Sequence, residues 1–272
     1  MRTRAVGGLL WLYDRTAKGG LLERPLPRRA FESAYLAYKQ LIEAGPVARL
    51  QSVVPPGSTV IDVGANIGFF TLRFGRWVEP GGHVIAIEPE SRNMATLRRR
   101  VRRARLQQVV DCVQAAAADC PGELKLAVNP AHPGDHRIAD DGEPVRAVTL
   151  DELATGDSRR VTLVKIDVQG AEMLVLTGAQ GVIEKDRPAI FVEIADWALE
   201  RFGSSGSELI EALTDLGYAG HMLTRRGIGG AEAAEALTAK SAKSYIDVLF
   251  LPRDPATVHG RNAGGSLTKY ST

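Results

Sequence analysis

The chain has 272 residues, of which 44% are hydrophobic and 24% charged, and its formal net charge is +2. These values are ordinary for a soluble globular protein with one large α/β core, and the net charge selects no class of partner. Two cysteines, Cys112 and Cys120, argue against a disulfide framework, and no Cys/His cluster indicates zinc. The apolar run 9–12 is too short to span a bilayer. We therefore predict a cytoplasmic protein.

Residues 1–56 lack the alternation of strands and helices that follows. Apolar residues at helical spacing predict a helix over 31–44, ended by Gly45 and Pro46, and a second short helix over 47–53. We interpret residues 1–56 as an N-terminal helical lid or an arm of a homodimer. The alternative is that the segment only covers an edge of the sheet.

The alternation begins with a strand over 60–63, a loop that holds Gly64 and Gly68, and a helix from 68 onward. A dinucleotide-binding loop needs a further glycine in the middle, and this loop has none. Asp62 at the strand end repels phosphate but suits the ammonium and sulfonium of S-adenosylmethionine. The second strand, 83–87, ends in Glu88, where an acid can bind ribose hydroxyls. The alternative is that Asp62 caps the loop and Glu88 is a solvated strand end.

A helix capped by Ser91 follows, and arginines cover its polar faces between 98 and 105. Such a run can grip phosphates but more commonly forms a solvated helix face. The third strand, 109–117, ends in small residues, so Ala116 is predicted to face the adenine ring. Two extra strands, 122–128 and 145–149, flank the polar loop 129–143, which contains His136.

The second half of the chain continues the alternation. A short helix over 150–154 precedes a β-branched strand over 161–166 that ends in Asp167, and a helix starts at 170. A fifth strand, 189–192, is followed by Glu193, and a helix over 207–216 follows. The last strands, 218–223 and 245–251, are predicted to pair antiparallel. Together these elements predict a catalytic domain over 57–252 and a flexible tail over 253–272.

Acids end four of these strands, at positions 62, 88, 167 and 193. The carboxyl ends of the parallel strands in a doubly wound sheet meet at one edge, where ligands bind. An unpaired buried carboxylate costs several kcal/mol, so the four acids predict a site. For Asp167 alone the alternative is a helix N-cap.

The motifs that carry these acids resemble the FkbM-type methyltransferases over roughly residues 31–251. The matching motifs are Asp-Val-Gly-Ala-Asn-Ile-Gly at 62–68, Ile-Glu-Pro at 87–89, Thr-Leu-Asp at 149–151, Lys-Ile-Asp-Val-Gln-Gly-Ala-Glu at 165–172, Glu193, and Asp-Val-Leu-Phe at 247–250. The resemblance implies a Rossmann-like class I methyltransferase fold, with a mostly parallel sheet of seven strands flanked by helices. It also implies O-methylation of a hydroxyl on a sugar, oligosaccharide, glycolipid or polyketide. No match covers the N-terminal segment.

A hydroxyl acceptor needs a group that removes its proton. Asp167 is the first predicted base and His136 the second; if Mg²⁺ is present, Asp167 and Glu193 are its predicted ligands and His136 becomes the base. The predicted acceptor is a small molecule or oligosaccharide rather than nucleic acid. The alternatives are a nucleic-acid methyltransferase that uses the arginine helix and an NAD(P)-dependent oxidoreductase. The residues predicted to bind S-adenosylmethionine are Asp62, Gly64, Asn66, Gly68, Glu88, Pro89 and Ala116.

Overall fold

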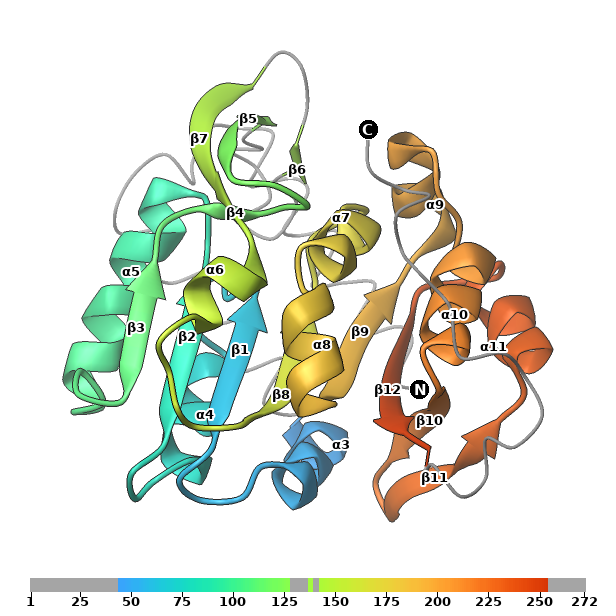
Figure 1. The fold of residues 1–272 in the computed structure, drawn as a ribbon, viewed down its shortest axis with the longest axis horizontal. Coiled ribbons are helices and arrows are strands. Elements are labelled where there is room, and N and C mark those ends of the chain that lie inside the picture. Colours follow the sequence, from blue (N-terminus) through green and yellow to red (C-terminus); the bar gives the residue numbers. More distant parts are fainter. Residues whose placement is uncertain (1–43, 128–136, 139–141, 254–272) are drawn as a thin grey trace, which may run out of the picture.

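The structure is a computed structural model that describes residues 44–127, 137–138 and 142–253. Its centre is an eight-stranded sheet in the order β11-β10-β12-β9-β8-β1-β2-β3 (Figure 1). The strands are β1 (Thr59–Val63), β2 (His83–Ile87), β3 (Val110–Val113), β8 (Val161–Ile166), β9 (Ala189–Ile194), β10 (Tyr218–Thr224), β11 (Gly227–Glu232) and β12 (Ile246–Pro252).

Five adjacent strands, β9, β8, β1, β2 and β3, run parallel. β12 is antiparallel to both of its neighbours, β9 and β10, which confirms the predicted antiparallel pair at the end of the chain. The mostly parallel α/β sheet is therefore confirmed, but the predicted number of seven strands is wrong. The additional strand, β11, pairs antiparallel with β10. Its sequence Gly-Ile-Gly-Gly-Ala-Glu has little intrinsic preference for a strand, so pairing within a hairpin determines it.

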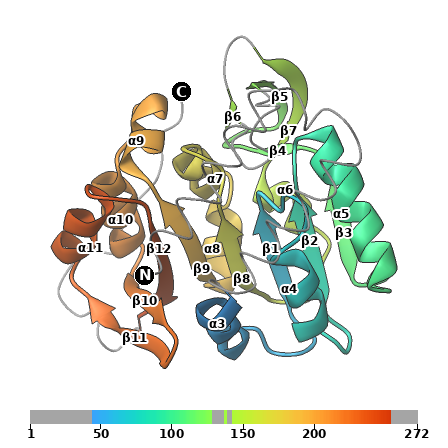
Figure 2. The ribbon, with the colours of Figure 1, turned by 180° about the vertical axis from the view of Figure 1, so that it is seen from behind.

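Helices cover both faces of the sheet, as the view from behind in Figure 2 also shows. One face packs against α6 (Leu150–Ala154), α7 (Glu172–Thr177), α8 (Gln180–Asp186), α10 (Gly206–Asp215) and α11 (Ala234–Ser241). The other packs against α3 (Ala44–Val47), the 3₁₀ helix Ala48–Val53, α4 (Thr71–Trp77) and α5 (Ser91–Arg103). Successive residues of β1 point to opposite faces, so Ile61 and Val63 join the first core and Val60 the second.

A second sheet lies beyond the carboxyl ends of β1 and β2 (Figure 1). Its order is β4-β7-β5-β6, from β4 (Ala116–Ala117), β5 (Gly122–Ala127), β6 (Arg137–Ile138) and β7 (Glu143–Val148). β5 and β7 confirm the two extra strands. The single strand predicted over 109–117 is wrong, because β3 ends at Val113 and Ala116 and Ala117 pair with β7 instead.

Several predicted boundaries also shift. α4 begins at Thr71 rather than at residue 68, and the cap of α5 is Glu90, whose side chain accepts bonds from the backbone N–H groups of Arg92 and Asn93. Gly45 and Pro46, predicted to end a helix, lie within α3. α9 (Asp196–Leu199) and the 3₁₀ helix Glu200–Phe202 were not predicted.

Parts of the predicted terminal segments lie outside the described residues, namely 1–43 of the N-terminal arm and 254–272 of the tail. Within the described part of the N-terminal arm, Val47 and Leu50 are buried in the core on the α4 face of the sheet. In the portion of the chain that the structure describes, no helix has the length and apolar character needed to cross a membrane.

Candidate functional site

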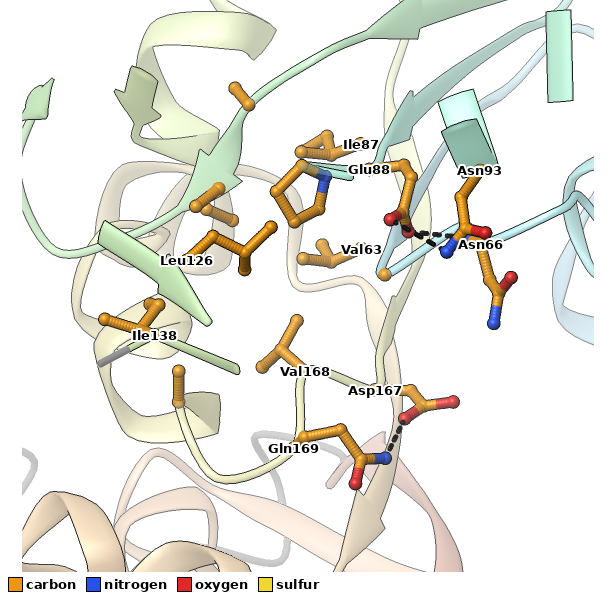
Figure 3. Close-up of a pocket in the computed structure, with 16 residues that line it drawn as sticks. Val63, Asn66, Ile87, Glu88, Asn93, Leu126, Ile138, Asp167, Val168 and Gln169 are labelled. Atoms are coloured by element: carbon orange, nitrogen blue, oxygen red, sulfur yellow. Dashed lines mark hydrogen bonds between the residues drawn. The ribbon is translucent and has the colours of Figure 1, made fainter. Parts of the chain in front are cut away.

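A pocket opens where β1, β2 and β8 end (Figure 3). The empty space at the pocket, counted out to open solvent, is about 630 Å³. The strand order changes direction here, because β2 lies on one side of β1 and β8 lies on the other. Such switch points are where doubly wound sheets bind ligands. The walls come from the loops after these strands and from Leu126 and Ile138 of the second sheet.

The loop after β1 forms the floor of the pocket in a conformation that glycine permits. Gly64 has a φ of 73°, and a Cβ there would lie 1.9 Å from the backbone oxygen of Asp167. Asn66 also adopts a positive φ, of 50°, which asparagine tolerates better than most residues. Its side-chain Oδ1 accepts a bond from the backbone N–H of Ile67 at 2.7 Å. The loop therefore brings β1 and the segment after β8 into direct backbone contact.

Glu88 follows β2 and lies on the pocket wall, 4% exposed. Its Oε2 accepts from the backbone N–H of Asn66 at 2.8 Å, and its Oε1 from the backbone N–H of Glu90 and the side chain of Asn93 at 3.1 and 3.3 Å. Burial nonetheless raises the pKa of Glu88 to about 7, against the opposing effect of these bonds. A carboxylate has about four acceptor positions, so these three bonds leave room for a ligand hydroxyl.

A wall of small and apolar side chains faces Glu88 across the pocket. Ala115, Ala116 and Ala117 are each at most 4% exposed, and their short side chains leave space beside the backbone. Leu126 and Ile138 of the second sheet extend this wall (Figure 3). The result is an apolar slot with a carboxylate on one side, which suits a flat heterocycle joined to a polyol.

Asp62 is fully buried on the opposite face of β1 from Val63, toward α4. Its Oδ2 accepts from the hydroxyl of Thr71 at 2.6 Å, and its Oδ1 lies 3.4 Å from Nζ of Lys165. Asp62 and Lys165 are register partners in the β1–β8 pair. Lys165 Nζ also donates to the backbone oxygens of Val63 and Gly64, at 3.0 and 2.8 Å. This buried pair therefore supports the glycine loop from below.

Asp167 follows β8 and lines the pocket on the other side of Val63 from Glu88 (Figure 3). The amide nitrogen of Gln169 donates to Asp167 Oδ1 at 3.2 Å and to Glu193 Oε1 at 3.4 Å. Gln169 has a φ of 57°, an uncommon conformation for a residue with a side chain. Such strain is concentrated at functional sites. Gln169 thus connects Asp167, which follows β8, with Glu193, which lies near the end of β9.

Glu172, at the start of α7, fixes the loop that carries Asp167 and Gln169. Its Oε1 accepts from the backbone N–H groups of Val168 and Gly170, at 3.3 and 3.1 Å. Its Oε2 is buried without a hydrogen-bond partner, and burial is the main cause that raises the pKa of Glu172 to about 7. The loop is therefore anchored from within the protein, and the carboxyl of Asp167 remains 25% exposed at the pocket.

Most of the predicted site residues gather at this pocket. Those that line it are Gly64, Asn66, Glu88, Pro89, Ala116 and Asp167. Among the described residues, those that line the pocket do not include Asp62, Gly68 or Glu193. Asp62 instead pairs with Lys165, and Gly68, with a φ of 85°, closes the loop. His136 lies outside the described residues, so its role stays a prediction.

Sequence reasoning did not assign Asn93, Gln169 or Lys165 to the site. Asn93 has a detectable signal, because it lies in the first turn of the helix after Glu88 and turns toward that strand end. Lys165 is recognisable as a charge inside an apolar strand. No signal indicates that Gln169 adopts a left-handed conformation.

The arginine run on α5 is partly used within the protein. Arg98 donates to the backbone oxygen of Cys112 at 3.4 Å, Arg99 to the hydroxyl of Thr96 at 3.1 Å, and Arg100 to the backbone oxygen of Ile67. Arg102, Arg103 and Arg105 are exposed. The Arg98 and Arg100 bonds connect α5 to β3 and to the glycine loop, whereas the Arg99 bond lies within α5.

Residues 62–219 match a family described as the Methyltransferase FkbM domain. A protein named Methyltransferase 1, from Beauveria bassiana (strain ARSEF 2860), is 29% identical over 149 residues, which make up 46% of this chain and 59% of that protein. The chain is also similar to the crystal structure of Methyltransferase FkbM from Methylobacillus flagellatus KT, with 17% identity and a TM-score of 0.45 over 71% of this chain and 43% of that one. A cofactor-bound structure of Rv0187 from MTB gives 18% identity and a TM-score of 0.46, over 87% and 96% of the two chains. The chain thus spans less than two thirds of the Beauveria and Methylobacillus proteins, at 59% and 43% of their lengths.

Proposed function

The chain belongs to the FkbM family of S-adenosylmethionine-dependent methyltransferases, and on that premise we propose that it methylates a hydroxyl oxygen of a carbohydrate-like acceptor. Its fold is the Rossmann-like class I methyltransferase fold. The observation that carries the proposal is one pocket with Glu88 on one side of Val63 and Asp167 on the other. One acid can bind the cofactor, and the other remains for the acceptor.

The residues of the pocket fit S-adenosylmethionine. Glu88 would accept bonds from ribose hydroxyls, Ala116 and Leu126 would contact the adenine ring, and Gly64 and Asn66 would lie along the methionine end. When bound, the cofactor supplies a methyl group that its sulfonium already activates. Asp62 would contribute indirectly, since its pair with Lys165 holds the backbone oxygens of Val63 and Gly64 in place.

Asp167 is the proposed base. A hydroxyl is a poor nucleophile, so a carboxylate within hydrogen-bond reach must accept its proton as the oxygen gains the methyl group. The Asp167 side chain is 25% exposed at the pocket, and Gln169 and Lys165 hold it from two directions. Orientation of the acceptor beside this carboxylate can contribute about 7–11 kcal/mol to the barrier reduction. His136 stays the second candidate.

The residues around Asp167 and Glu193 are poorly arranged to bind Mg²⁺. Mg²⁺ prefers oxygen ligands at octahedral positions. Between Asp167 and Glu193 lies an amide nitrogen of Gln169, a donor, at 3.2 and 3.4 Å from their oxygens. In the portion of the chain that the structure describes, no group of three or more His, Cys, Asp or Glu residues is placed to hold a metal. We therefore derive no step through a metal ion.

The carbohydrate acceptor rests on the polar loop predicted over 129–143 and on the family resemblance. A nucleic-acid acceptor would need the arginines of α5. Arg98 and Arg100 bond to other parts of the protein, whereas Arg102 and Arg103 are exposed. An oxidoreductase would need a loop suited to pyrophosphate, which the spacing of Gly64 and Gly68 does not provide.

The test is mass spectrometry of products after incubation with S-adenosylmethionine and a panel of hydroxylated sugars. We expect a sugar product that is one methyl group heavier. In Asp167→Asn, turnover should fall by about 10²-fold or more while cofactor binding is retained. Glu184→Gln, on the exposed face of α8, is the control for the loss of one carboxylate charge away from the pocket. Full activity with a chelator supports the metal-free base. Near-wild-type turnover in Asp167→Asn, or preference for a phenol or nucleic acid over every sugar, contradicts the proposal.

A further inference from the structure

Gln169 adopts a backbone conformation that favours glycine, although it carries a long side chain. Its φ is 57°, in the left-handed region. Oε1 of Glu172 accepts from the backbone N–H groups of Val168 and Gly170, which flank Gln169 on both sides. A Cβ on Gly170 would lie 2.3 Å from the backbone oxygen of Ala198, so the loop also packs closely against α9. These contacts fix the left-handed conformation at position 169.

The backbone of this loop would be satisfied by a residue without a side chain. Glycine adopts a positive φ without the steric penalty that a Cβ brings, so it is the least costly residue at such a position. Strained residues are concentrated at functional sites, where the strain accompanies a needed geometry. The presence of glutamine at position 169 therefore points to a role of its side chain.

The side chain of Gln169 is directed toward Asp167 (Figure 3). Its Nε2 donates to Asp167 Oδ1 at 3.2 Å and to Glu193 Oε1 at 3.4 Å. An ionised carboxylate only accepts hydrogen bonds, so these two acids determine that the NH₂ end of the amide faces them. The bond to Glu193 thus helps to hold the amide that bonds to Asp167.

The carboxylate of Asp167 depends on such a bond to keep one orientation. Rotation about the last bond of an aspartate side chain is broad, and this side chain is 25% exposed. Lys165 Nζ lies 3.8 Å from Asp167 Oδ2, beyond hydrogen-bond distance, so it attracts the charge without setting its direction. The amide of Gln169 supplies the directional contact. Orientation matters here because a base must come within ~2.6–3.2 Å of the acceptor oxygen.

We propose that Gln169 is a positioning residue that acts through Asp167, and that its left-handed backbone places its amide where it holds the carboxylate of the base toward the acceptor. This inference rests on the proposed role of Asp167 as the base. Gln169 neither accepts the proton nor supplies the methyl group. Its loss should therefore slow methyl transfer and leave cofactor binding unchanged.

The test removes this side chain in a variant that also relieves the strain. Gln169→Gly should be about as stable as the wild type in urea unfolding, because relief of the strained φ offsets the lost hydrogen bonds. Its kcat should nevertheless fall about tenfold or more, with little change in the KM for the acceptor or in the affinity for S-adenosylhomocysteine. Arg105→Gly is the matched control, because Arg105 is exposed and has nearly the same φ, of 60°. It should keep the wild-type kcat.

A double-mutant cycle distinguishes action through Asp167 from a general loosening of the pocket. If Gln169 acts through Asp167, adding Gln169→Gly to Asp167→Asn should cause no further loss of kcat beyond that of Asp167→Asn alone. Gln169→Glu keeps the length of the side chain but replaces the N–H donor with an acceptor. It should therefore lower kcat at least as much as Gln169→Gly does.

The outcomes separate this inference from the proposed function. If Asp167→Asn lowers turnover but both Gln169 variants keep the wild-type kcat, or if the losses multiply in the double variant, the positioning role is refuted and the proposed base stands. Near-wild-type turnover in Asp167→Asn refutes both. If no sugar is methylated, the proposed acceptor fails and NMR decides the inference: the side-chain amide signals of Gln169 should shift in Asp167→Asn, and unchanged signals refute the contact.

Discussion

The buried carboxyl of Glu88 makes cofactor affinity dependent on pH in the neutral range. Its pKa is raised from 4.5 to about 7, mainly because the group is buried. Ribose hydroxyls donate best to the ionised form, so S-adenosylmethionine should bind more tightly as the pH rises through about 7. About one eleventh of Glu88 is ionised at pH 6 and ten elevenths at pH 8. The dissociation constant should therefore fall about tenfold between these values, or about 1.4 kcal/mol.

Isothermal titration calorimetry of wild type and Glu88→Gln across pH 5.5–8.5 measures this dependence. The glutamine keeps the shape of the side chain and one acceptor oxygen but cannot titrate. Its affinity should be lower than that of the wild type at pH 8 by about 1–3 kcal/mol, because hydroxyl partners are left poorly matched. The difference between the two proteins also cancels titration of the ligand's own groups.

Glu172 is the necessary second control, because its pKa is also raised to about 7 and it lies beside the loop of Asp167. Glu172→Gln should keep the wild-type change of affinity with pH. The assignment of Glu88 to the ribose is refuted if Glu88→Gln retains that change, or if the wild-type affinity is the same at pH 6 and pH 8.

Two further predictions concern stability and are measured by urea unfolding. Gly64→Ala should lower the free energy of unfolding by at least about 3 kcal/mol, because its Cβ would lie 1.9 Å from the Asp167 oxygen at a φ of 73°. Gly156→Ala, with a φ of 87° and no atom within 4 Å of its Cβ, should lose only about 1–2 kcal/mol; equal losses would contradict the close contact. The raised pKa of Glu172 means that the folded protein holds its proton longer than the unfolded chain, so this group lowers stability as pH rises from 4.5 to about 7. Between pH 4.5 and pH 8, the free energy of unfolding of Glu172→Gln should rise by up to about 3 kcal/mol relative to that of the wild type. Parallel pH profiles for the two proteins would show that Glu172 does not titrate in this range.

The sequence predicts the pocket best where residues follow a strand rather than lie within it. Glu88 and Asp167 come directly after the last residues of β2 and β8, so the pleat does not determine their direction. Because parallel strands end at one edge of the sheet, their positions could be predicted from strand order alone. The second sheet was also predictable as strands, but its place over the pocket was not, because that depends on the break between Val113 and Ala116.

Contacts that depend on backbone conformation could not be predicted in this way. Gln169 reaches both Asp167 and Glu193 only because its φ is positive, and a glutamine carries no preference for that region. The lack of space for a Cβ at Gly64, beside the backbone oxygen of Asp167, likewise depends on how closely β1 and β8 approach. The sequence indicates that the loop needs a glycine at position 64, but it does not indicate that the backbone of Asp167 lies beside it.

Asp62 shows how strand alternation can direct a motif residue away from the pocket. It lies one residue before the end of β1, so its side chain points to the opposite face from Val63 and from the pocket wall that Val63 forms. On that face, the register of β1 with β8 places Lys165 directly beside it. Removal of either partner would leave a buried charge uncompensated, which typically costs about 3–5 kcal/mol. An acid inside a parallel strand therefore predicts a cation on the neighbouring strand before it predicts a ligand, and in this chain the lysine two residues before Asp167 was that cation.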